Sequence, residues 1–100
     1  YDVWLTPTLG APPLKLGTVD IHERDPQKAF APIIDYVPFT AIENATGQPS
    51  ISLPLHWSAE GLPVGIMFSG RFGDEATLIR LAAQLEKAQP WKDRHPKVWN

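Results

Sequence analysis

The side chains that could do chemistry in this sequence are four serines, three histidines and a pair of neighbouring acids. The serines are Ser50, Ser52, Ser58 and Ser69. None of them lies in the Gly-x-Ser-x-Gly pattern that exposes a nucleophile on a strand-to-helix turn. Ser52 instead alternates with apolar residues as on a strand face, and Ser58 stands in a turn sequence. The serines therefore predict no catalytic centre within this chain.

The histidines predict no metal site. They are scattered at His22, His56 and His95, and no pair has a metal-binding spacing such as His-Glu-x-x-His. The sequence contains no cysteine, which excludes thiol catalysis, zinc–thiolate sites and disulfides. We therefore expect neither metal ligands nor cofactor-binding residues in this chain.

The segment Gly70-Arg71-Phe72-Gly73-Asp74 joins a predicted strand to a predicted helix, and such a junction can present backbone N–H groups to an anion. The third glycine of a dinucleotide fingerprint is missing, however, and Asp74 and Glu75 would repel a phosphate. Because these two acids are adjacent, they also diverge around a helix and form no acid–base pair. We interpret the junction as a tight turn.

Composition limits the partners that this chain can have. It has 100 residues, a net charge of -2 and 43% hydrophobic residues, which suits one ordinary globular domain. Without a basic surface, nucleic acid and anionic membranes are poor partners. The sequence shows no signal peptide and no apolar run long enough to cross a membrane, so we expect a soluble, cytoplasmic protein.

The first third of the chain is expected to be largely irregular. Residues 2–6 predict a short strand that stops at Pro7, and a loop rich in proline and glycine follows. Further on, Asp25 and Pro26 suit the N-cap and the first position of a helix. Pro32 breaks that pattern, so we expect only one or two short helical turns.

A β-hairpin is predicted in the middle of the chain. In residues 50–57 the apolar side chains recur at every second position, as on a strand. Pro54 cannot donate to a strand ladder, so this strand lies at a sheet edge or contains a bulge. Residues 58–61 form the hairpin loop, and 64–70 form a return strand apolar enough to be buried on both faces.

Helices flank this hairpin in sequence. A short helix is predicted over 38–45, with Gly47 suited to its C-cap. A longer one over 74–89 begins with two acids that favour the positive end of the helix dipole and ends before Pro90. Its apolar stripe consists of Leu78, Leu81, Ala82 and Leu85, widened by Ile79, Ala83 and Ala88. Together the elements predict an α/β fold in the order strand, loop, short helices, hairpin, long helix.

Three segments, in this order, resemble the C-terminal end of the amidase signature family. The first is DVWLTPT (2–8), the second runs from PFT to NATGQPSISLP (38–54), and the third runs from GLPVGIM through GR and DE to QPW (61–91). The resemblance spans nearly the whole chain. Within the family, the sequence is similar to bacterial amidases of the kind that includes 6-aminohexanoate-cyclic-dimer hydrolases.

The resemblance implies one large α/β/α domain with a mixed sheet, of which residues 1–100 form a single C-terminal segment. Enzymes of this family hydrolyse carboxamides through a serine acyl-enzyme, without a metal or organic cofactor. Their nucleophile is activated through a second serine, held by a cis peptide bond, and a lysine. All three lie upstream of the matching segments, and no lysine of this chain matches the family lysine. The resemblance therefore implies no catalytic residue here and an isolated chain that is inactive.

What the resemblance carries over is scaffold and pocket wall. The implied substrate-pocket residues are Thr6, Thr8, Asn44, Thr46 and Gly47. Turn chemistry alone also explains the last three, since glycine lets the chain turn tightly into a strand, and it is the simpler interpretation. The irregular, Pro-rich region 10–37 is where substrate-selecting loops would vary. The implied partner is a small-molecule amide substrate.

Two hypotheses follow about the role of this chain. In the first it is a segment of a larger amidase, which the strand-like opening at Tyr1, without a polar leader, also favours. That hypothesis predicts exposed apolar surface, because the remainder of the sheet is missing. In the alternative it is an independent structural or binding module derived from the amidase fold, which completes its core by self-association as a homo-oligomer.

Overall fold

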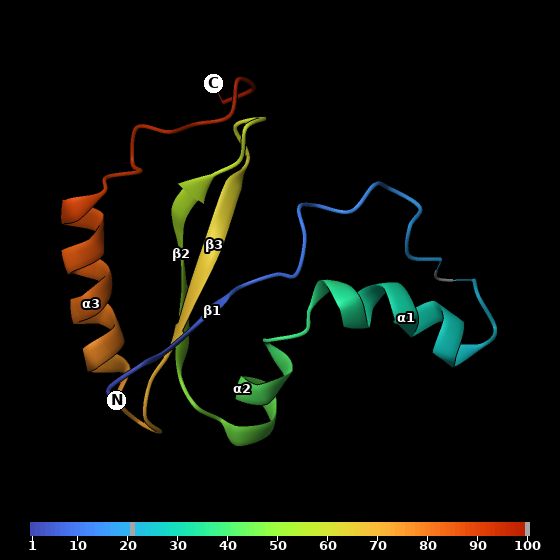
Figure 1. Cartoon of the computed structure of the whole chain (residues 1–100), viewed down its shortest axis with the longest axis horizontal. Helices are drawn as coiled ribbons and strands as arrows, with labels where there is room; N and C mark the ends of the chain where they lie inside the picture. Colours follow the sequence, from blue (N-terminus) through green and yellow to red (C-terminus); the bar gives the residue numbers. More distant parts are fainter. Residues whose placement is uncertain (21, 100) are drawn as a thin grey trace.

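The structure is a computed structural model and describes residues 1–20 and 22–99. Its centre is a three-stranded antiparallel sheet in the order β1-β3-β2 (Figure 1). The strands are β1 (Trp4–Pro7), β2 (Ser50–Trp57) and β3 (Pro63–Ser69). The helices are α1 (Pro26–Tyr36), α2 (Ala41–Thr46) and α3 (Glu75–Ala88). The predicted α/β class and order of elements are confirmed.

The hairpin of β2 and β3 forms as predicted. The Ser58 N–H donates to the Leu62 carbonyl across its loop, at 2.9 Å. β2 is an edge strand whose register shifts between Leu53 and His56, so Pro54 lies both at an edge and at a bulge. β3 is the central strand, but only its last three residues are buried, so burial on both faces is confirmed for that end alone.

β1 differs from its predicted bounds. It begins at Trp4 rather than at Asp2, and it includes Pro7, which pairs with Ile66. A proline fits there because β1 is the other edge of this three-stranded sheet. At an edge, the missing N–H can face away from the neighbouring strand.

The prediction of one or two short turns around Pro32 is wrong, because α1 runs unbroken for 11 residues through that proline. Asp25 caps the helix as predicted, accepting a hydrogen bond from a backbone N–H of its first turn. Pro32 removes only the one bond that its own N–H would have donated. The last turn still closes, with the Val37 N–H donating to the Ile33 carbonyl at 2.8 Å. The region 10–37 is therefore not irregular throughout.

α3 covers one face of the sheet (Figure 1). Asp74 is its N-cap and accepts a hydrogen bond from the Thr77 N–H. Leu78, with 3% of its surface exposed, packs against Leu53 of β2 and Phe68 of β3. This contact joins the helix to two strands at once and forms the core of the described chain.

The apolar stripe of α3 is narrower in the structure than in the prediction. Leu81 and Leu85 pack, partly buried, against the core around Leu78, as does Ala82. Ile79 is 63% exposed, and Ala83 and Ala88 are exposed too. The prediction that these three residues widen the buried stripe of α3 is wrong for this chain. Its three strands are too few to cover so broad a stripe. None of the helices in the described ranges is both long and apolar enough to cross a membrane.

The described chain is more open than a self-contained domain of its length. Its Cα radius of gyration is 16.1 Å, against about 13 Å expected for a compact domain of this length. Its accessible surface is 7965 Å², against roughly 5,700 Å² expected for a folded monomer of this mass. The buried hydrophobic side chains of the described residues are Leu53, Met67, Phe68 and Leu78. Such a small core is incomplete in itself.

Candidate functional site

The sheet face opposite α3 carries hydroxyl groups. The strand register places Met67 of β3 between Thr6 of β1 and Ser52 of β2, so the three side chains project from the same face. Ser69, two residues further along β3, projects from that face as well. Two predicted pocket residues, Thr6 and Thr8, are thus brought to one side of the sheet, since Thr8 follows Thr6 by two positions.

A hydrogen bond between two hydroxyls crosses the central strand on this face. The Oγ1 of Thr8 and the Oγ of Ser52 lie 2.6 Å apart, above Gly65. A Cβ at residue 65 would stand 2.7 Å from each of these oxygens, closer than real Cβ contacts allow. The Thr8 N–H also donates to the Gly65 carbonyl at 3.0 Å. We call Thr8, Ser52 and Gly65 the clasp, because they fasten the segment after β1 to the hairpin.

A buried acid approaches the same face from α2. Glu43 is 8% exposed, and its Oε1 accepts a 2.6 Å hydrogen bond from the hydroxyl of Ser69, which is 6% exposed. Among the described residues, the Glu43 Oε2 has no hydrogen-bond partner, and neither has the buried Oγ1 of Thr6. Because Glu43 and Ser69 are both almost fully buried, this pair fastens α2 to β3 and is not open to a substrate.

The other three predicted pocket residues lie at the end of α2. Thr46 Oγ1 donates to the Ile42 carbonyl at 3.0 Å, and Gly47 is the C-cap with φ of 71°, a left-handed conformation that glycine adopts easily. Asn44 is exposed. The Thr46 hydrogen bond and the left-handed Gly47 agree with the simpler interpretation of this loop, in which these residues form a turn. Whether the five residues touch a substrate stays a prediction.

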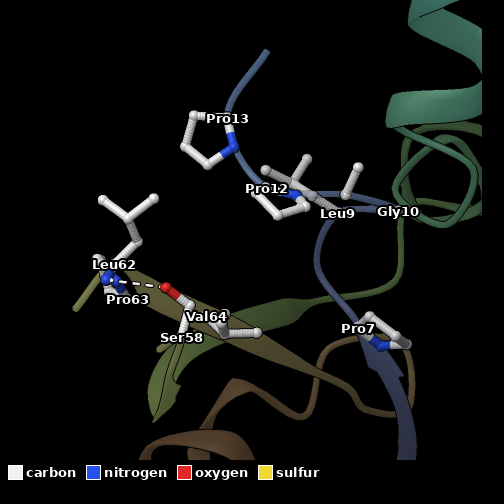
Figure 2. Close-up of a pocket in the computed structure, with 11 residues that line it drawn as sticks. Pro7, Leu9, Gly10, Pro12, Pro13, Ser58, Leu62, Pro63 and Val64 are labelled. Carbon is white, nitrogen blue, oxygen red and sulfur yellow. Dashed lines mark hydrogen bonds between the residues drawn. The ribbon is translucent and has the colours of Figure 1, made fainter. Parts of the chain in front are cut away.

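A pocket of about 360 Å³ lies next to the clasp, between the segment that follows β1 and the hairpin (Figure 2). Its lining residues are Pro7, 9–13, Ser58 and 62–65. None of the five predicted pocket residues lines it, although Thr8 stands between two residues that do. No sequence signal marks this pocket, because its walls come from distant parts of the chain.

One side chain of the pocket, Ser58, is engaged within the hairpin loop. Its Oγ accepts a hydrogen bond from the Leu62 N–H at 3.2 Å. Its hydroxyl also hydrogen-bonds to Glu60, which lowers the pKa of that exposed carboxyl. In the described part of the chain, no group of three or more His, Cys, Asp or Glu residues could hold a metal ion.

Comparison with known proteins identifies the family to which this architecture belongs. A model of the family described as Amidase matches residues 1–79. The chain belongs to the amidase family. It is 46% identical over 91 residues to AmiC of Mycobacterium leprae (strain TN), which bears the name of an amidase; the match covers 91% of this chain and 19% of AmiC. It is 41% identical over 96 residues to the 6-aminohexanoate-cyclic-dimer hydrolase of Paenarthrobacter ureafaciens, covering 95% and 19%.

The same likeness holds in three dimensions. A solved structure of 6-aminohexanoate cyclic dimer hydrolase matches the whole of this amidase chain with a TM-score of 0.89 and 33% identity, over 22% of its own length. A second, complexed with substrate, matches with a TM-score of 0.85 and 34% identity. The resemblance to amidases is therefore confirmed, and the chain spans about a fifth of the length of the relatives it matches.

Within residues 1–20 and 22–99 of this amidase chain, the serine hydroxyls have no activating base beside them. In the described residues, no serine hydroxyl is hydrogen-bonded to a histidine or a lysine. Ser52 bonds to Thr8, Ser69 bonds to the buried Glu43, and Ser58 is engaged in its turn. A serine nucleophile needs such a neighbouring base. Ser52, Ser58 and Ser69 are thus engaged in contacts that hold the local structure.

Proposed function

We propose that this chain is the C-terminal segment of an enzyme that hydrolyses carboxamide C–N bonds through a serine acyl-enzyme. In this proposal the Ser–cis-Ser–Lys triad lies outside these 100 residues, and the substrate is a small-molecule amide. The observation that carries the proposal is the match of the entire chain to about a fifth of a cyclic-dimer hydrolase, with a TM-score of 0.89. The proposal is also supported by the described serine hydroxyls, none of which is hydrogen-bonded to a histidine or a lysine.

Exposed apolar surface is the second support. Leu5 on β1, Phe30 and Ile34 on α1, and Phe72 before α3 are each more than half exposed. Apolar surface that a chain leaves uncovered is available for contact with other parts of a protein. In the proposal, the remainder of the amidase domain covers these residues, and the chain alone is inactive.

The alternative role, a self-associating module, draws on the same exposed side chains, with a second copy as the cover. It would make the isolated chain a stable oligomer, whereas a monomer at every concentration in light scattering would contradict it. A cytoplasmic location stays a prediction.

Amide hydrolysis tests the proposal. We compare the isolated 100-residue chain with the parent protein, by which we mean a polypeptide of the relatives' length that contains this segment. With simple aliphatic and aromatic amides, ammonia release is expected from the parent and not from the isolated chain. An inactive parent would contradict the proposal. Activity in the isolated chain would do so too, because it would require a nucleophile and a base within these residues.

A further inference from the structure

We infer that Glu43 holds two strands of the sheet at once. The Ser69 hydroxyl donates to its Oε1, and in this inference the Thr6 hydroxyl donates to its Oε2. The inference goes beyond the proposed function, because it concerns how α2 is seated on β1 and β3 and needs no hydrolysis. It gives Thr6 a role inside the protein, in place of the substrate contact that the sequence predicts.

Two buried oxygens of the described residues lack a hydrogen-bond partner, and their chemistry is complementary. They are the Oε2 of Glu43 and the Oγ1 of Thr6. The two residues are 8% and 7% exposed. An ionised carboxylate only accepts hydrogen bonds, whereas a threonine hydroxyl has a proton to donate. Since buried polar groups nearly always have a partner, each of these oxygens supplies what the other lacks.

Both side chains meet the same face of the sheet. In the register of β1 and β3, Trp4 is opposite Ser69, and Thr6 follows Trp4 by two positions. Thr6 and Ser69 are therefore diagonal neighbours, and such neighbours lie about 7–8 Å apart in an antiparallel pair. Glu43 already reaches this face, since its Oε1 is 2.6 Å from the Ser69 hydroxyl. A carboxylate that accepts one hydrogen bond on each oxygen is long enough to span this diagonal.

The described chain itself encloses both oxygens, which leaves no opening for another partner. A side chain from the remainder of the parent protein could reach the Glu43 Oε2 only by displacing α2. Among the described residues, no lysine, arginine or histidine pairs with Glu43. The Thr6 hydroxyl, in contrast, moves by rotation about one bond, between the staggered positions of χ1.

The hydrogen bond from Thr6 completes the seat of α2. On the β3 side, this seat already has the bond between Glu43 and Ser69. Just after the helix, Gln48 Nε2 also donates to the Gly70 carbonyl at 3.1 Å. Among the described residues, no hydrogen bond joins α2 to β1. With Thr6 as the second donor, one carboxylate fixes α2 across two strands.

A double-mutant cycle in the parent protein tests the inference. Thr6→Val removes the hydroxyl at nearly constant shape, and Glu43→Leu removes its acceptor. Thr6→Val alone is expected to raise the equilibrium constant for unfolding at least fivefold, because the carboxylate loses a donor. In the Glu43→Leu background the same change should raise this constant no more than twofold, since no carboxylate is left to pair. An equal factor in both backgrounds overturns the inference.

Thr8→Val is the matched control for Thr6→Val. Thr8 lies two residues further along the chain, and its Oγ1 is hydrogen-bonded to Ser52 at 2.6 Å rather than to Glu43. Its effect on the unfolding constant should therefore be the same in both backgrounds. Urea unfolding followed by circular dichroism gives the constants.

A crystal structure of the parent protein decides the matter if Glu43→Leu does not fold. The Thr6 Oγ1 is expected within about 3 Å of the Glu43 Oε2, the length of a hydrogen bond. A separation above about 3.5 Å, or a different donor on this Oε2, overturns the inference.

Discussion

Leu78→Ala is expected to lower the free energy of unfolding of the parent protein by about 2–5 kcal/mol. Leu78 is the only buried residue of α3, and its side chain contacts Leu53 and Phe68. It also sits 3.3 Å from where a Cβ on Gly70 would stand, so the backbone of the turn packs directly against it. Truncation leaves a cavity where the helix meets the sheet. Urea unfolding followed by circular dichroism measures the change.

Gln84→Ala is the matched control for this change. Gln84 lies on the same helix and is exposed. Glutamine and alanine both favour helix formation, so the substitution replaces one good helix former with another. Its effect on the free energy of unfolding should stay within about 0.5 kcal/mol. Equal effects of Leu78→Ala and Gln84→Ala would show that α3 does not depend on the core described above.

Ser69→Ala is expected to destabilise the parent protein by about 1–3 kcal/mol, the cost of leaving a buried polar group without its hydrogen-bond partner. The substitution removes the donor to the Glu43 Oε1, while the Oε2 has no partner among the described residues. The carboxyl group would then be buried without any hydrogen bond that the described structure supplies. Thermal unfolding at neutral pH measures the loss.

Ser50→Ala provides the comparison. Ser50 of β2 is directly opposite Ser69 in the sheet register but is exposed, so its loss should change the free energy of unfolding by no more than about 0.5 kcal/mol. Adding Glu43→Gln to Ser69→Ala should recover part of the stability, since a neutral amide costs less to bury than a carboxylate. A Ser69→Ala variant as stable as Ser50→Ala would contradict the anchoring role of Glu43.

The parts of the fold that were predictable from sequence are the locally determined ones. The hairpin follows from alternating side chains, the end of α2 from Gly47, and the start of α3 from Asp74, since each signal lies within a few residues of its effect. The sequence did not predict the helix through Pro32. A rule for proline considers the one backbone hydrogen bond that it removes, and not the helical turns on either side. The narrow stripe of α3 depends on how many strands lie beneath it, which no local pattern contains.

The candidate site was less predictable for a related reason. Thr6 and Thr8 are predicted pocket residues, but the hydrogen bond of Thr8 to Ser52 depends on β1 pairing with β3, which is distant in sequence. The need for glycine at Gly65 likewise appears only when two hydroxyls meet above it. The sequence did not predict a buried role for Glu43, because a single acid in a short polar helix is usually exposed to solvent.

The nucleophile of the parent amidase is proposed to lie outside these 100 residues. The most direct test labels the parent protein with a fluorophosphonate, which reacts with activated serines, and maps the labelled peptide by mass spectrometry. We expect a single labelled serine outside this segment and loss of amide hydrolysis on labelling. A label on Ser50, Ser52, Ser58 or Ser69, with the same loss of activity, would contradict it.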